Sequence, residues 1–141
     1  MKSLQVASFV IVIILAAALR IPQLGGSFWL DEAAQVLESA RPMSQQLNIR
    51  DDFQPPLLHL ILHFALYISK EEWWLRTIGA VVPGLLSILG TMLIAKHLLP
   101  KPQQLGGSVF VGLLLATNSF HLFYSQELRQ YALPTALAVW S

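Results

Sequence analysis

The sequence predicts an all-α fold: a polytopic transmembrane helical bundle with juxtamembrane helices in the first extracytoplasmic loop. Hydrophobic residues make up 55% of the 141 residues and charged residues only 12%, about half the charged share of an ordinary soluble domain. The apolar residues form runs without charge, as helices that cross a bilayer core of about 30 Å require. The net charge of +1 leaves no basic surface for nucleic acid. The lack of cysteine excludes disulfides and thiolate chemistry.

Four apolar runs predict the membrane spans. The first, over about 4–20, follows Lys2; a signal peptide is the alternative, but the later runs favour a retained anchor. The second, over about 76–96, contains glycines and a proline, which membrane helices tolerate. A third covers about 104–122, and a fourth, over 131–141, is incomplete. We therefore expect the chain to be the amino-terminal part of a longer membrane protein.

Two shorter helices are expected at the membrane surface, over about 31–40 and 55–69. As a helix the second would be about 22 Å long, which is too short to cross the bilayer core. Prolines begin this segment, and charged residues and tryptophans follow it, a composition typical of the interface. Because positively charged loops face the cytoplasm, Lys96 and Lys101 place their loop inside. Both surface helices and residues 124–131 then face outside.

An acidic pair, Asp31 and Glu32, stands directly after an apolar stretch. Asp31 is expected to cap the helix that begins there, and both acids suit the positive end of the helix dipole. One acid suffices for a cap, so the second indicates a further role. Carboxylates serve as general bases and as ligands of hard cations.

A second polar motif occupies residues 124–131. If it is helical, Tyr124, Glu127 and Tyr131 share one face, while Ser125 and Arg129 share another. The alternative is an interfacial aromatic girdle with an ordinary ion pair.

Two histidines and several charged residues lie between the first two spans. His59 and His63 stand four residues apart, which suits a metal pair or two hydrogen-bonded interfacial histidines. Asp51 and Asp52 cap a helix or are solvated. Arg76 begins a span and either snorkels or holds an anionic head group.

Four stretches, taken in order, resemble the amino-terminal region of membrane glycosyltransferases of the C type. The resemblance is greatest to bacterial relatives of the protein mannosyltransferases that use dolichyl-phosphate mannose and of lipid A aminoarabinose transferase. It covers nearly the whole chain. The stretches are "LDEAAQVLESA", "DDFQPPLLHLILHF", "WWLRTIGAVVPGLLSILGTMLIAKHLL" and "LLLATNSFHLFYSQELRQYAL".

The resemblance implies sugar transfer from a polyprenyl-phosphate donor to a hydroxyl of a lipid, glycan or protein acceptor. The reaction would take place on the outer side of the bacterial plasma membrane, among membrane lipids. Asp31 matches the catalytic acid and Glu32 its companion, while Gln54 and His59 fall near the donor. Members of the family have many more spans, so we expect the chain alone to be inactive. The second polar motif supplies further substrate-binding candidates, which are Tyr124, Glu127 and Arg129.

The chemistry of such a transfer suits these side chains. An acceptor hydroxyl loses its proton as it attacks, so a carboxylate such as Asp31 can serve as general base. The departing phosphate needs positive charge, which Arg129 or Arg76 can supply. A divalent cation is the alternative source, with Asp31, Glu32 and Glu127 as its candidate ligands. A single displacement with inversion at the sugar carbon requires no covalent enzyme intermediate.

Two other functions remain open. A small non-enzymatic membrane protein could assemble with partner helices through Gly84 and Gly90, because small residues let membrane helices approach closely. A transporter ranks behind both, since the interiors of the expected spans hold no ionisable residues.

Overall fold

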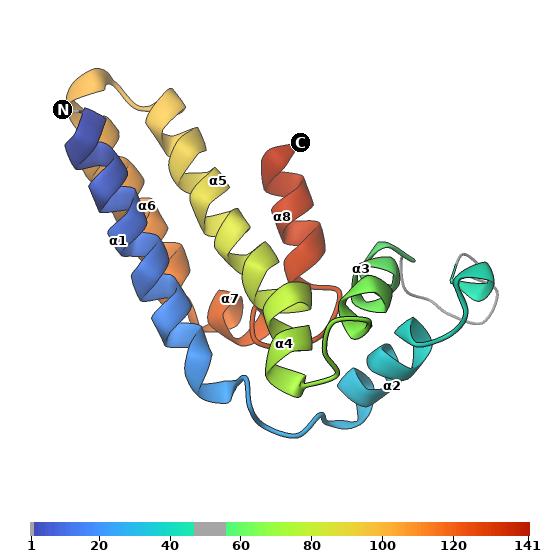
Figure 1. Ribbon diagram of the computed structural model, residues 1–141. Helices are drawn as coiled ribbons and strands as arrows, with labels where there is room; N and C mark the ends of the chain where they lie inside the picture. Colours follow the sequence, from blue (N-terminus) through green and yellow to red (C-terminus); the bar gives the residue numbers. More distant parts are fainter. Residues whose placement is uncertain (1, 47–55) are drawn as a thin grey trace.

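The computed structural model describes residues 2–46 and 56–141, and this part of the chain is helical without a strand. Figure 1 shows the long helices running side by side, with the short helices gathered at the end of the bundle opposite to both termini. The elements are α1 (Lys2–Arg20), η1 (Ile21–Gln23), α2 (Leu30–Ser39), η2 (Met43–Gln45), α3 (Pro56–Leu66), α4 (Glu72–Arg76), η4 (Thr77–Val81), α5 (Val82–Leu98), η5 (Lys101–Gln103), α6 (Gln104–Thr117), α7 (Ser119–Tyr124) and α8 (Ala132–Trp140).

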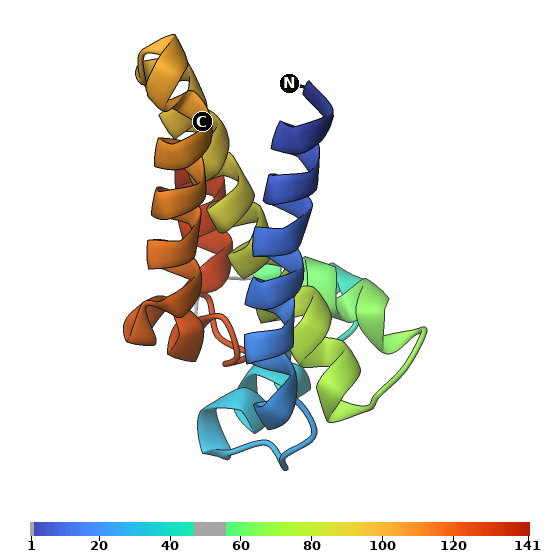
Figure 2. The same cartoon turned by 90° about the vertical axis from the view of Figure 1, so that its left-hand side faces the viewer.

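Helices α1, α5 and α6 form the main core. Small residues at their contacts let the helices approach: a side chain on Gly112 of α6 would collide with the sulfur of Met92 on α5. Figure 2 shows the same helices rising together from the end that carries α2 and α3. The buried core residues are Phe9, Val12, Ala16, Ile88, Met92 and Ala116.

Within residues 2–46 and 56–141, two helices are long and apolar enough to cross a membrane, judged by length and composition. They are Ser3–Gln23 and Glu72–Leu98, of 21 and 27 residues. The second runs continuously through α4, η4 and α5, and η4 is a π-helical turn at Gly79, where Leu128 and Leu62 lie close to the backbone. Most of the apolar side chains on α1 are exposed, Ile11 to 65%.

The third expected span is shorter than predicted. The run over 104–122 is interrupted at Asn118, which adopts an extended conformation and accepts a hydrogen bond from the backbone N–H of His121 at 2.9 Å. Asparagine competes in this way with the helical backbone and favours a new helix start. The apolar run is therefore divided into α6 and α7. The fourth run contains α8, which begins at Ala132.

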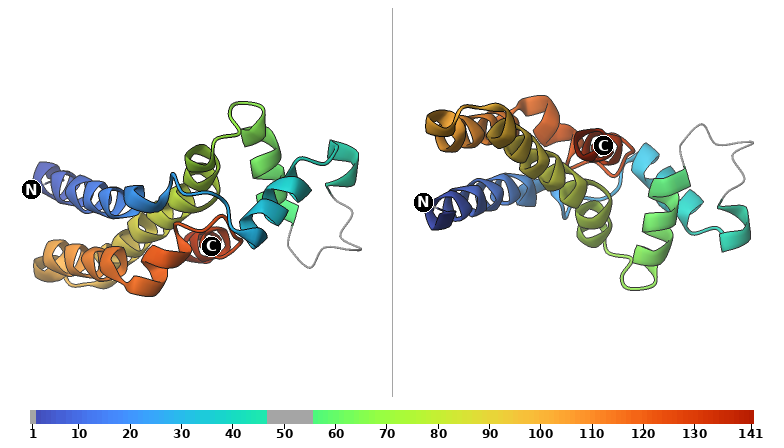
Figure 3. Two further views of the ribbon diagram at one scale, coloured as in Figure 1. Left: turned by 90° about the horizontal axis from the view of Figure 1, so that it is seen from below. Right: turned by 90° about the horizontal axis from the view of Figure 1, so that it is seen from above.

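The two short helices of the first loop form where the sequence predicts them, with α3 ending at Leu66, three residues before the expected boundary. They extend to one side of the bundle (Figure 3). Helix α2 buries polar side chains: Glu32, Gln35 and Ser39 are buried, whereas Leu30 and Leu37 are 82% and 71% exposed. Buried polar side chains, together with the half-buried Val36 that packs against the apolar cluster of Leu58, Leu62, Ala65, Leu75 and Leu128, therefore hold α2 in place.

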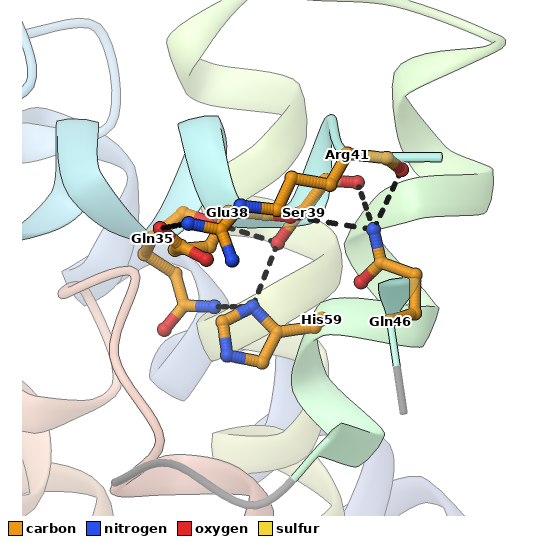
Figure 4. Close-up of polar contacts among 6 residues, drawn as sticks. All are labelled: Gln35, Glu38, Ser39, Arg41, Gln46 and His59. Carbon is orange, nitrogen blue, oxygen red and sulfur yellow. Dashed lines mark hydrogen bonds and ion pairs between the residues drawn. The ribbon is translucent and has the colours of Figure 1, made fainter. Parts of the chain in front are cut away.

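Figure 4 shows how α2 is attached to α3. The amide of Gln35 donates to Nδ1 of His59 at 2.9 Å. The side chain of Gln46 donates to the carbonyl of Arg41 at 2.8 Å and to that of Ser39 at 3.1 Å, which caps the carboxyl end of α2. These bonds satisfy carbonyl groups that a helix end otherwise leaves unpaired.

Gly84 of α5 offers a test of close packing. A Cβ atom there would overlap Cβ of Ser125, which is fixed to its own backbone and cannot rotate away, whereas Gly106 of α6 faces open space. We expect Gly84→Ala to lower the free energy of unfolding by about 1–3 kcal/mol. The matched change Gly106→Ala should raise it by about 0.5–1 kcal/mol, because alanine favours a helix over glycine. Thermal unfolding in mild detergent, followed by circular dichroism, compares the two; equal stability would contradict the close contact.

Candidate functional site

A buried ion pair between Glu32 of α2 and Arg76 of α4 lies at the centre of the site. The guanidinium binds the carboxylate through two parallel bonds, Nε to Oε1 at 2.9 Å and Nη2 to Oε2 at 2.6 Å. Its other N–H groups donate to backbone carbonyls of Leu24 (2.8 Å), Ser27 (3.2 Å) and Gly26. All five donors of Arg76 are thus used. Arg76 and Glu32 therefore act as a clamp, a buried ion pair that links α4 to α2. Arg76 has no donor left for a head group or a phosphate.

Glu32 also fixes the segment after α7. Its Oε1 accepts the backbone N–H of Leu128 at 2.8 Å, so both of its oxygens are engaged inside the protein. The helix considered for 124–131 does not form: α7 ends at Tyr124, and residues 125–131 follow as turns and bends. The bond to Glu32 replaces the helical bond of that N–H group. The two tyrosines of the motif still meet, with the ring centroids of Tyr124 and Tyr131 4.5 Å apart.

Asp31 and Arg129 lie next to this clamp and pair with each other. Nη1 of Arg129 is 3.1 Å from Oδ2 of Asp31, and the side chains are 18% and 43% exposed. The expected capping role of Asp31 is wrong, because α2 begins one residue earlier and its N-cap, Trp29, makes no side-chain capping bond. In the described part of the chain Arg129 has no other side-chain partner, so most of its N–H groups remain available.

A pocket of about 380 Å³ is lined by the buried pair of Glu32 and Arg76, whereas Asp31 and Arg129 are not among its lining residues. It brings together η1, the start of α2, the end of α4, α7 and the turns after α7. Glu127 lies in it, and burial raises the pKa of this carboxyl above its usual value near 4.5; the nearby charge of Glu32 acts in the same direction, and Arg129 opposes it. The lining residues are Gln23, Trp29, Glu32, Arg76, Phe123, Gln126 and Glu127.

The donor set does not fit a bound divalent cation well. Hard cations need several oxygen ligands, and within residues 2–46 and 56–141 no three His, Cys, Asp or Glu side chains gather as a metal site requires. Glu32 is already occupied by Arg76 and Leu128. Of the three candidate ligands, only Asp31 and Glu127 have oxygens to offer.

The histidine pair lies away from this pocket, between α3 and α2. His63 donates from Nδ1 to the carbonyl of Ser39 at 2.9 Å, while His59 binds Gln35, one helical turn beyond Glu32. Both rings are buried in the helix contact, which matches the hydrogen-bonded alternative. Three other predicted residues lie outside the described residues, namely Gln54, Asp51 and Asp52.

Arg20 is a residue of the site region that sequence reasoning missed. It is fully buried at the end of α1, where its backbone carbonyl accepts the amide of Gln126 at 3.1 Å. In the sequence it simply ends an apolar run, as many boundary arginines do. Only the arrangement of the helices reveals that it lies inside the protein.

The buried pair can be tested through stability. Glu32→Gln leaves Arg76 buried without its counter-charge, so we expect a loss of about 3–5 kcal/mol in the free energy of unfolding. The control is Glu38→Gln, which removes the partly exposed pair of Glu38 with Arg41 (2.6 Å) and should cost at most about 1 kcal/mol. Thermal unfolding of both variants in the same detergent gives the comparison. Similar losses would show that the buried pair is not the clamp.

The raised pKa of Glu127 predicts a pH dependence. A carboxyl that binds its proton more tightly when folded makes the protein less stable as pH rises from its unfolded pKa through its folded pKa. Glu127→Gln, which cannot ionise, should match the wild type near pH 4 and have the higher melting temperature at pH 7–8. Melting curves across this range test the sign. A variant less stable than the wild type at pH 8 would contradict it.

No family model, no curated protein and no solved structure matches the chain. A function is therefore inferred from the side chains of the chain itself. The most informative of them are Asp31 and Arg129, which are distant in sequence and adjacent in space.

Proposed function

We propose that the chain is part of an integral membrane glycosyltransferase. It would move a sugar from a polyprenyl-phosphate donor to an acceptor hydroxyl on the outer side of a bacterial plasma membrane. The observation that carries the proposal is the partly exposed pairing of Asp31 with Arg129 at 3.1 Å; Glu32 and Glu127, which lie close to them in the sequence, line the first pocket. This transfer needs a base that takes the proton of the acceptor hydroxyl and a cation that binds the donor phosphate.

The membrane part of the proposal rests on two apolar helices and on the exposed apolar surface of α1. Such a surface would favour aggregation of a protein in water but suits contact with lipid. We propose that Ser3–Gln23 and Glu72–Leu98 are spans of a multi-pass protein. Lys96 lies in the last turn of α5 and Lys101 in η5, and the connection from α5 to α6 lies at the end of the bundle away from α2 and α4 (Figure 1). Positive loops face the cytoplasm, so the pocket would face outside.

Asp31 is the proposed general base. Its Oδ2 is paired with Arg129, and the side chain is 43% exposed, so an acceptor hydroxyl can reach the carboxylate. In the proposed step the acceptor oxygen attacks the sugar carbon and gives its proton to Asp31. The bond from that carbon to the phosphate oxygen breaks, and its electrons leave with the polyprenyl phosphate. Attack opposite to the leaving group inverts the sugar carbon.

Arg129 is the proposed partner of the donor phosphate, and Arg76 is not. Arg76 has all its donors bound within the protein, whereas Arg129 has free donors and partial exposure. No step of this proposal passes through a metal ion.

The alternative of a non-enzymatic protein that assembles with partner helices has less support. Gly84 packs against Ser125, and Gly90 packs against Val139 and Trp140. Both glycines that would admit a partner helix are already covered by segments of the same chain.

A binding and transfer assay tests the proposal. The chain is expressed within the longer membrane protein that the proposal assumes, in native membranes that supply an acceptor, and is given a radiolabelled polyprenyl-phosphate hexose; bound donor and transferred label are measured separately. We expect Arg129→Gln to weaken donor binding about tenfold or more, because it removes charge-assisted bonds to phosphate. Asp31→Asn should keep donor binding and lower transfer by a factor of about 10²–10⁴.

The control variant is Glu38→Gln, on the same helix but in a separate surface pair with Arg41, and it should behave as wild type in both measurements. Wild-type donor binding by Arg129→Gln would remove the proposed phosphate contact. Equal transfer by Asp31→Asn and wild type would remove the proposed base.

A further inference from the structure

Arg20 carries a buried charge without a counter-charge. Its side chain is 0% exposed, and an arginine stays protonated in proteins. Each ion pair that the described residues form belongs to another arginine: Arg41, Arg76 or Arg129. A buried charge that lacks an opposite charge is costly.

The three partners of Arg20 are neutral. Nε donates to Oγ of Ser125 at 2.7 Å, Nη1 to the carbonyl of Ala16 at 2.7 Å, and Nη2 lies 2.8 Å from Nδ1 of His121. The guanidinium can only donate, so Nδ1 must be the acceptor. The hydrogen of the neutral ring is then on Nε2. Arg20 therefore fixes His121 as a hydrogen-bond donor on its other ring nitrogen and polarises that N–H group with its positive charge.

A second pocket, of about 400 Å³, lies against this group between α7 and α8. His121 and Ser125, two of the partners of Arg20, line it, and so do Tyr124 and Tyr131, whose rings are in contact at an angle of 55°. Unlike the first pocket, this one is lined by no carboxylate. The remaining lining residues are Asn118, Phe120, Ala132 and Thr135.

We propose that this second pocket binds the phosphate group of an ester, with Nε2–H of His121 as a donor and Arg20 behind it as the compensating charge. The anion supplies the negative charge that the region around Arg20 lacks. The aromatic rings provide an apolar surface for the part of the ligand next to its phosphate. This site is separate from the Asp31–Arg129 pair, and phosphate binding here does not depend on whether the chain transfers sugar.

Nuclear magnetic resonance of the chain labelled with ¹⁵N-histidine gives a direct test, since the sequence has only four histidines. The protein in neutral detergent is titrated with inorganic phosphate, with dihexanoyl phosphatidic acid and with citronellyl phosphate; citronellol is the uncharged control. We expect a saturable shift of the His121 Nε2 resonance with a phosphate compound and none with citronellol. A response to inorganic phosphate identifies a free-phosphate site, and a response to the two amphiphiles alone identifies a lipid head-group site. No saturable shift with any of the three phosphates would overturn the proposal.

Variants separate binding from structure. His121→Asn keeps an acceptor near Arg20 but removes the donor on the pocket side, so we expect it to weaken phosphate binding about tenfold, while His121→Gln should retain more of the binding. Arg20→Met should melt at or above the wild-type temperature without phosphate, because it removes a buried charge that lacks an opposite charge. It should also lose the phosphate-dependent rise in melting temperature.

The matched control is Glu38→Gln, in the surface pair with Arg41, which should leave phosphate binding in the second pocket unchanged. If phosphate instead raises the melting temperatures of Arg20→Met and the wild type equally, the inference fails. It also fails if Arg20→Met melts far below the wild type and phosphate stabilises neither protein, since Arg20 would then be only a link between α1 and α7.

Discussion

The ion pair of Glu32 with Arg76 determines the arrangement of the whole site. Glu32 joins α2 to the start of the long helix 72–98 and, through the N–H of Leu128, to the turns after α7. Arg76 fixes the segment that leads into α2 through its carbonyl contacts. Asp31 is the sequence neighbour of Glu32, and Arg129 is the neighbour of Leu128. Once the pair forms, Asp31 and Arg129 are brought face to face.

Three arginines of this region differ in what their guanidinium groups can still bind. Arg76 has a carboxylate and three carbonyls and is saturated. Arg129 has one carboxylate at a partly exposed position, and Arg20 has three neutral acceptors and no acid. The charge of all three is the same, so their roles depend on the number of acceptors around each one. A sequence cannot show this number, because the acceptors come from segments far away along the chain.

Much of the helical architecture follows from local pattern. The charge-free runs predict the long helices, and the prolines and charges around residues 55–69 predict a short separate helix, which the structure contains as α3. The break at Asn118 was missed because one polar residue in an apolar run is a weak local signal. Its effect depends on the bond to the N–H of His121.

The site could be predicted only in part. The sequence identifies Asp31 and Arg129 as polar groups of the same side, and the structure brings them together. The turns at 125–131 could not be predicted, because the N–H of Leu128 is satisfied by Glu32 from another helix. For the same reason the clamp role of Arg76 depends on carbonyls of residues 24–27, whose positions are set by tertiary structure.

The face by which α2 contacts the bundle is largely polar, and this has a thermodynamic consequence. Detaching this helix would hydrate Glu32, Gln35 and Ser39, whereas Leu30 and Leu37 are already outside. Exposure of apolar area is what gives unfolding its large heat capacity and its sensitivity to denaturant. Val36 packs against the second apolar cluster, so local opening of α2 would hydrate polar groups together with some apolar area, and its heat-capacity change and its response to urea would be smaller than those of global unfolding. Added salt screens charged groups and would change the free energy of this opening only where ions reach the buried contacts.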